Sequence, residues 1–116
     1  MSAKPSLPQR LDPIHRLAQN REDEAARRFA DSQRALQQQE NQLREMERYL
    51  LEYEAGRPGA GLAPAMLANR EIFLRQLAEA LRWQARAVDE ARGRLDLARQ
   101  QWLGRHRDTG VLEQLI

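Results

Sequence analysis

The sequence contains no cysteine, few aromatic residues and no long run of apolar residues. Without cysteine it forms no disulfide and offers no thiolate ligand to a metal ion, which fits a reducing compartment. No run approaches the roughly 20 apolar residues that a membrane-spanning helix requires. Residues 1–10 also lack the apolar stretch of a secretory signal. These absences predict a soluble cytoplasmic protein.

Glycine and proline are scarce too, and residues 56–61 form the one internal break that is rich in them. On both sides of this break, apolar or small residues recur at alternating spacings of three and four, the heptad pattern of a coiled coil. The first stripe contains Ala18, Ala25, Phe29, Ser32, Leu36, Leu43, Met46, Leu50 and Tyr53. The second contains Leu67, Leu74, Leu77, Leu81, Val88, Ala91, Leu95, Ala98, Trp102, Leu112 and Ile116. This pattern predicts an all-α fold in which two long helices form an antiparallel coiled-coil hairpin.

The predicted organisation is a single coiled-coil domain with a disordered leader over residues 1–12, a first helix over 13–55, a turn over 56–63 and a second helix over 64–116. Asp12 is the expected cap of the first helix, and Pro13 its first residue, where the missing N–H costs nothing. Gly56 is expected to close that helix in the left-handed conformation. Pro64 is expected in the first turn of the second helix. The alternative is an open hinge at 56–61 that lets two chains pair.

A turn centred near Ala60 predicts the register of the two helices. In this register large side chains face small ones along the seam between the stripes. Polar interruptions of the stripes then lie beside leucines of the other helix. The expected neighbours are Phe29 with Ala91, Ala18 with Trp102, Gln39 with Leu81, and Gln84 with Leu36.

Apolar residues outside the stripes gather on one flank of the predicted hairpin, near its turn. They occupy heptad position g of both helices, and the two g positions border the same side of the seam in an antiparallel pair. This strip consists of Gln42, Tyr49, Met66, Phe73 and Ala80, with Ile72 and Trp83 near the same end. Exposed aromatic residues grouped in this way favour a protein-binding surface. The alternative is that Tyr49 and Phe73 cover the seam and pack on Met46 and Leu77.

The charged residues predict solvated helix faces. There are 19 basic residues against 17 acidic ones, for a formal net charge of +2, and Lys4 is the only lysine. Arg and Glu are interleaved along both predicted helices rather than segregated, so no nucleic-acid partner is expected. An anion-binding helical hairpin that uses its arginine-rich ends is the alternative.

No catalytic, cofactor or metal site is predicted. Catalysis requires polar groups that converge in a cavity from which water is excluded, and a two-helix hairpin has no such interior. His15 and His106 are expected near the same end, but they have too few companion ligands for a metal ion. The glycines of residues 56–61 lack the following Lys-Ser/Thr of a phosphate-binding loop.

Several short elements together suggest a family. Residues 17–27 contain Glu-Asp-x-Ala-Ala-Arg, and later elements are Gln42-Leu43, Tyr49, Glu52-Tyr53, residues 69–73 and Trp102. In these elements the chain resembles the FliJ family of flagellar type III export proteins, from about Leu11 to Leu115. Two departures are Arg70, where an aromatic is common before the Phe, and the end at Ile116, beyond which the family usually continues with more charged helix.

The resemblance implies a non-enzymatic, cytoplasmic coiled-coil stalk that couples an export ATPase ring to the export gate, peripheral to the membrane. The implied partners are the hexameric export ATPase, the cytoplasmic domain of the membrane export-gate protein, and export chaperones. The family's gate-binding surface maps onto Gln42, Met46, Tyr49, Tyr53, Phe73, Leu77, Ala80 and Gln84. Arginines toward the chain ends would contact the ring, chiefly Arg27, Arg28, Arg94 and Arg99. Alternatives are the stalk protein of a virulence-type type III secretion system and a generic coiled-coil scaffold.

Overall fold

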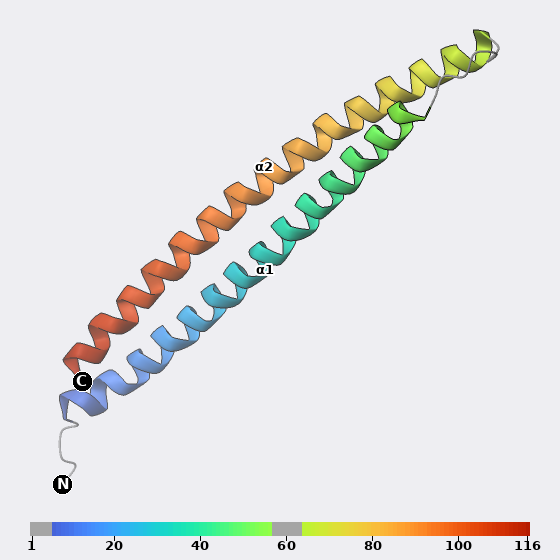
Figure 1. Cartoon of the computed structure of the whole chain (residues 1–116). Helices are drawn as coiled ribbons and strands as arrows, with labels where there is room; N and C mark the ends of the chain where they lie inside the picture. The colour runs from blue at the N-terminus through green and yellow to red at the C-terminus, as the bar shows by residue number, and fades with distance from the viewer. Residues whose placement is uncertain (1–5, 57–63) are drawn as a thin grey trace. The chain divides into compact units, whose positions relative to one another are not determined.

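The computed structural model describes residues 6–56 and 64–116, apart from the side chains of Pro64 and Ala65. It contains helix α1 over Leu7–Ala55 and helix α2 over Pro64–Leu115 (Figure 1). Both helices are rich in Ala, Leu, Arg, Glu and Gln, which are the strongest helix formers. The predicted all-α fold with two long helices is confirmed. Most of the predicted turn and the first part of the predicted leader lie outside the described residues.

Helix α1 begins at Leu7 rather than at the expected Pro13. Its start is fixed by Ser6 and Gln9, because the side chain of each accepts a hydrogen bond from the backbone N–H of the other. The backbone N–H of Ser6 donates to Oε1 of Gln9 at 2.9 Å, and the backbone N–H of Gln9 donates to Oγ of Ser6 at 3.4 Å. This reciprocal cap satisfies two free backbone donors, so the helix starts before Pro13. Asp12 is therefore not the cap and instead pairs with Arg16 at 3.3 Å inside the helix.

The end of α1 at Ala55 also differs in detail from the expectation. The backbone N–H of Gly56 still donates to the carbonyl oxygen of Glu52 at 2.9 Å, and Gly56 does not take the left-handed conformation. A Cβ added at Gly56 would lie 3.2 Å from the carbonyl oxygen of Tyr53. Glycine is favoured here because a side chain would crowd the last turn, and not because of a positive φ.

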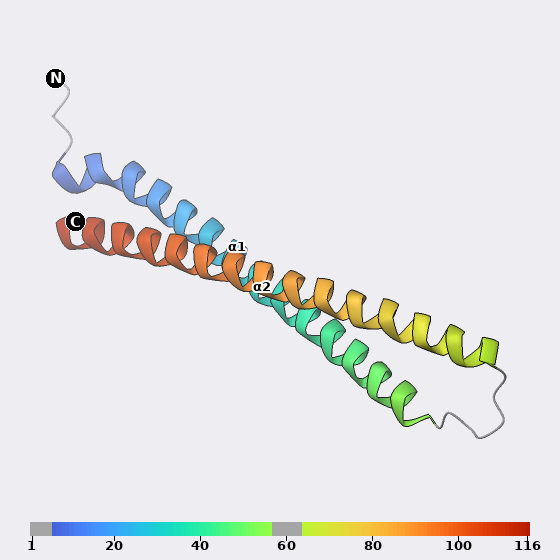
Figure 2. The same ribbon diagram turned by 90° about the horizontal axis from the view of Figure 1, so that it is seen from above.

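The described chain divides into two compact units. Unit 1 comprises Met1–Arg34 with Gly93–Ile116, and unit 2 comprises Ala35–Arg92. Within each unit a segment of α1 and a segment of α2 lie side by side and antiparallel, as both views show (Figures 1 and 2). The predicted antiparallel pairing within one chain is thus confirmed for each unit, while the single coiled-coil domain stays a prediction.

The most buried side chains are four residues of the two stripes and one threonine. They are Ala25 and Ala98 with Thr109 in unit 1, and Val88 and Ala91 in unit 2. No large side chain among the described residues is fully buried. The seam is therefore narrow, as the heptad pattern predicts, and small residues let the paired helices approach closely.

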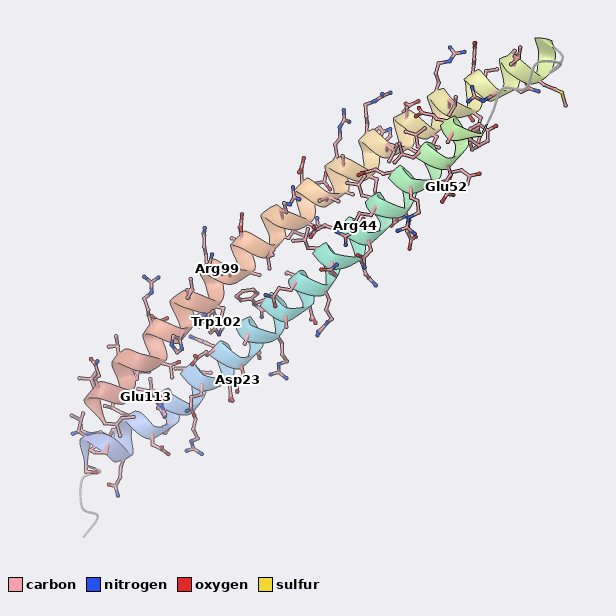
Figure 3. All side chains as sticks on the ribbon, in the orientation of Figure 1. Asp23, Arg44, Glu52, Arg99, Trp102 and Glu113 are labelled. Atoms are coloured by element: carbon pink, nitrogen blue, oxygen red, sulfur yellow. The ribbon has the colours of Figure 1, made fainter. Side chains whose placement is uncertain are left out.

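The register of the helices differs from the predicted one. In unit 1 the ring of Phe29 packs edge-on against Trp102, with 5.8 Å between the ring centroids, and Trp102 points toward α1 (Figure 3). In unit 2 the side-chain amide of Gln84 donates to Oε1 of Gln39 at 2.8 Å and to its backbone oxygen at 3.0 Å. The predicted register was wrong because leucine offers an amide no hydrogen bond, whereas a second amide does. Two aromatic rings likewise gain an edge-to-face contact that alanine cannot provide.

Candidate protein-binding surfaces

Three aromatic residues of unit 2 form one cluster, called here the aromatic cluster: Tyr49 and Tyr53 of α1 and Phe73 of α2. The ring of Phe73 lies 4.6 Å from that of Tyr53 and 6.2 Å from that of Tyr49, measured between centroids. The two tyrosine rings are 6.4 Å apart. Tyrosines four residues apart share one side of a helix, so both can meet a ring of the neighbouring helix. The structure thus brings three of the predicted gate-binding residues into direct contact.

The aromatic cluster is partly a surface and partly a cover for the seam. Tyr49 is 51% exposed, whereas Tyr53 and Phe73 are half-buried. Phe73 thus covers the seam in part, as the alternative interpretation of the strip expects, while a binding role for the exposed Tyr49 stays a prediction. The buried edges hold the three rings in place, and the open side of Tyr49 is available for contact.

Arg70, which departs from the family pattern, borders the aromatic cluster. Its guanidinium lies 5.8 Å from the centroid of the Tyr53 ring. The same group donates to the backbone oxygen of Glu54 at 3.5 Å. A cation over a tyrosine face is attracted by the ring quadrupole, so Arg70 covers Tyr53 where an aromatic residue is common in the family.

The other predicted gate-binding residues differ in their exposure. Gln42 is exposed, and Met46, Leu77 and Ala80 are half-buried in the same unit. Gln84 uses its side-chain N–H groups on Gln39, so these donors point into the seam. The part that these residues play in a binding surface stays a prediction.

Trp83 and Ile72 lie outside the aromatic cluster. Trp83 is 62% exposed, and Arg86 stacks over its ring at 5.0 Å from the centroid. Because a helix turns by about 100° per residue, Trp83 and Ile72 lie roughly a quarter turn around α2 from Phe73. Their grouping with the strip, suggested by their place in the sequence, therefore does not extend to a shared cluster.

The arginines predicted to contact the ATPase ring are all exposed in unit 1. They are Arg27 and Arg28 on α1, and Arg94 and Arg99 on α2. Arg28 pairs with Glu24 at 3.5 Å, and Arg99 points away from α1 (Figure 3). Solvated guanidinium groups of this kind can attract an acidic partner surface, and their contact with a ring stays a prediction.

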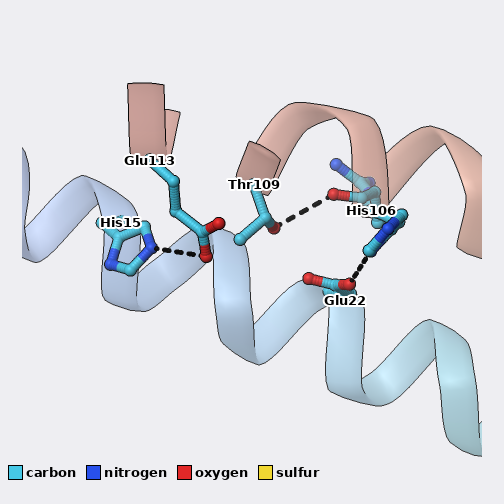
Figure 4. Close-up of polar contacts among 6 residues, drawn as sticks. His15, Glu22, His106, Thr109 and Glu113 are labelled. Atoms are coloured by element: carbon cyan, nitrogen blue, oxygen red, sulfur yellow. Dashed lines mark hydrogen bonds and ion pairs between the residues drawn. The ribbon is translucent and has the colours of Figure 1, made fainter. Parts of the chain in front are cut away.

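Two histidine–glutamate pairs join the helices of unit 1, and the predicted register did not reveal them. Nε2 of His15 lies 3.4 Å from Oε1 of Glu113, and Nδ1 of His106 lies 2.5 Å from Oε1 of Glu22 (Figure 4). The signal is present in the sequence: His15 and Glu22 are one heptad apart on α1, as are His106 and Glu113 on α2. In antiparallel helices such an order places each histidine opposite an acid.

Glu22 is held as a carboxylate by its neighbours. The hydrogen bond from His106 lowers the pKa of Glu22 below its ordinary value of 4.5, although partial burial opposes this. The neighbouring Thr109 side chain and the charge of His106 also lower the pKa of Glu22. Thr109 itself donates to the backbone oxygen of Arg105 at 3.0 Å. These groups form a polar contact between the helices.

The described residues contain no group of three or more metal-ligating side chains. Neither described helix is long and apolar enough to cross a membrane. Among the described residues, we regard the aromatic cluster as the candidate surface for binding a partner.

The family model described as the flagellar FliJ protein matches residues 8–116. The chain belongs to the FliJ family. No curated protein and no solved structure matches the chain. Membership in the FliJ family gives it a general role in flagellar protein export, in a family that is cytoplasmic and known as a non-enzymatic component of the export apparatus.

Proposed function

We propose that the chain couples the hexameric export ATPase to the membrane export gate, and that it assists the cycling of export chaperones at the membrane-associated apparatus. FliJ family membership supports the general export role. The observation that carries the finer proposal is the aromatic cluster, in which Tyr49 is 51% exposed beside two partly buried rings.

The aromatic cluster has the properties of an anchor for a protein partner. Exposed Tyr and Trp residues dominate the binding energy of many interfaces when they fill a pocket on the partner. Tyr49 is already positioned by Tyr53 and Phe73, so that binding costs little side-chain entropy. We assign the gate contact to this surface, with Gln42, Met46, Leu77, Ala80 and Gln84 at its borders.

The ring contact is assigned to unit 1. The exposed guanidinium groups of Arg27, Arg28, Arg94 and Arg99 lie on both of its helices. Charges at the rim of an interface mainly steer association and select the partner. An ATPase ring with acidic groups along its central opening would fit this unit.

The gate contact is tested by titrating the cytoplasmic domain of the gate protein with the parent chain and with Tyr49→Ala. We expect Tyr49→Ala to weaken binding by about tenfold to a hundredfold, the loss typical of an aromatic anchor. Trp83→Ala is the matched control, because it removes an aromatic side chain of similar exposure outside the aromatic cluster. Equal losses in the two variants, or none in Tyr49→Ala, would contradict the proposal.

The ring contact is tested with Arg27→Glu combined with Arg99→Glu in a binding assay against the hexameric ATPase. We expect weaker binding and a smaller dependence of affinity on salt than in the parent. Arg44→Glu makes the same kind of change at an exposed position in unit 2 and should bind the ring as the parent does. If the double variant binds the ATPase as tightly as the parent, unit 1 does not make the ring contact.

A further inference from the structure

The face of unit 2 that carries the aromatic cluster has charges of one sign only. It consists of heptad positions c and g of both helices, which lie next to each other on one side of the seam. Among the described residues of unit 2, the charged ones at these positions are Glu45 and Glu52 on α1 and Glu90 on α2. All three are exposed acids. This surface is called here the acidic face.

The charge of the acidic face does not follow from the composition of the chain, whose formal net charge is +2. In unit 1 the same heptad positions carry both signs, as at Arg21 and Asp31. The opposite flank of unit 2, at positions b and e, mixes acids with four arginines: Arg44, Arg75, Arg82 and Arg92. The absence of basic residues is therefore particular to the face on which Tyr49 is exposed.

Two of these carboxylates flank Tyr49. Glu45 precedes it by four residues and Glu52 follows it by three, so all three side chains lie on the same side of α1. Neither carboxylate forms an ion pair with a described residue. The half-exposed ring of Tyr49 thus lies between two solvated negative charges.

Three arginines of unit 2 border the acidic face, at positions d and f. Arg70 lies over the ring of Tyr53, and Arg86 lies over the ring of Trp83. Arg48 lies on the outer side of α1 and forms no ion pair with a described residue. These neighbouring cations therefore leave the carboxylates beside Tyr49 unpaired.

Unpaired carboxylates beside an anchor restrict the chemistry of the partner. A surface that covers Tyr49 also takes Glu45 and Glu52 partly out of water, and this desolvation is unfavourable unless each charge gains a partner. An acidic partner would add repulsion to this cost. Lysine or arginine side chains on the partner would offset it and would also speed the encounter.

We propose that Glu45 and Glu52 select the segment of the gate protein that covers Tyr49, and that this segment is basic. It carries lysine or arginine side chains beside an apolar pocket for the tyrosine ring. The inference rests on the proposed function, because it specifies the chemistry of the same partner. The ring of Tyr49 supplies the anchor, and the two carboxylates determine which charge the partner must carry.

A double charge reversal tests the proposal. Glu45→Lys combined with Glu52→Lys is titrated against the cytoplasmic domain of the gate protein, and we expect the dissociation constant to rise at least about tenfold. The control combines Glu47→Lys with Glu54→Lys. It makes the same change of charge on the same helix, with the same spacing of seven residues, at exposed positions of the opposite flank, and it should bind as the parent does.

The dependence of binding on salt gives a second readout. Attraction between opposite charges is screened by ions, so the affinity of the parent and of the control should fall as salt is raised. The Glu45/Glu52 variant should lose this dependence or reverse it. All four positions are exposed and lysine is a good helix former, so helicity measured by circular dichroism should be the same in every variant.

The outcomes separate this inference from the proposed function. If the Glu45/Glu52 variant binds as tightly as the parent, or more tightly, the partner segment is not basic and the inference fails. Equal losses in the two double variants would overturn it as well, because net charge and not this face would then be responsible. If Tyr49→Ala weakens binding in the same assay, the proposed gate contact stands in both cases.

Discussion

Glu22 and His106 meet across the two helices of unit 1, with 2.5 Å between Oε1 of Glu22 and Nδ1 of His106. This contact makes stability depend on pH. In the folded chain the pKa of Glu22 lies below its ordinary value of 4.5. The Glu22 carboxylate therefore stabilises the fold at higher pH, and this stabilisation is lost as the pH falls through the lowered pKa. Thermal melting should show Glu22→Gln below the parent at neutral pH, with the difference vanishing in acid.

The control for this prediction is Glu45→Gln, which removes a carboxylate from an exposed position of α1. Its melting temperature should stay close to that of the parent across the same pH range. A gap between Glu22→Gln and the parent that stays constant from neutral to acidic pH would show that the carboxylate charge is not responsible.

Gln39 and Gln84 satisfy each other within unit 2, so the loss of one leaves the other without its partner. Gln84→Leu should lower the free energy of unfolding by about 1–3 kcal/mol, the cost of an unsatisfied, partly buried amide. Gln39→Leu with Gln84→Leu should recover most of this loss, because two leucines pack without unmet hydrogen bonds. Urea unfolding of the parent, both single variants and the double variant measures the coupling, and additive losses would argue against the pair.

The rings of Phe29 and Trp102 pack edge-on between the two helices of unit 1. Replacing either by alanine should destabilise the chain by about 2 kcal/mol or more, because much of the ring is buried. A double-mutant cycle should give a coupling free energy of about 0.5–1.5 kcal/mol. The initially predicted register places these rings far apart, so it requires a coupling free energy near zero in the same experiment.

Tyr49 and Phe73 should respond differently to truncation although their rings touch. Phe73 is half-buried against Tyr53, so Phe73→Ala should lower the free energy of unfolding by about 1–3 kcal/mol. Tyr49→Ala, at a more exposed position, should lower it by less than about 1 kcal/mol. Denaturant unfolding of the two variants separates seam cover from exposed surface, and equal losses would mean that both rings are structural.

The heptad pattern was sufficient to predict the fold because it records which residues are buried. Residues such as Ala25, Val88 and Ala98 lie on the predicted stripes and are buried in the structure. Strong helix formers between the stripes leave few places at which either helix could end. The start of α1 was missed because the Ser6–Gln9 cap competes with the signal of Asp12 and Pro13, and the earlier cap also yields the longer helix.

Register could not be read from apolar residues alone, because a stripe that repeats every heptad stays buried when it slides by one repeat. The aromatic cluster was partly foreseen from heptad position g, which places Tyr49 and Phe73 on the same flank of the seam. Arg70 over Tyr53 was not foreseen, because the position of a long cationic side chain depends on the neighbouring helix.

The order of the two histidine–glutamate pairs also bears on how the helices of unit 1 can slide. If α2 moved by one heptad in one direction, Glu22 would face Glu113, and two carboxylates would repel each other. A move of one heptad in the other direction would bring His15 to His106, where neither ring finds an acid. Four polar residues thus distinguish one register from the neighbouring registers that the apolar stripes alone tolerate, because only this register pairs each histidine with a glutamate.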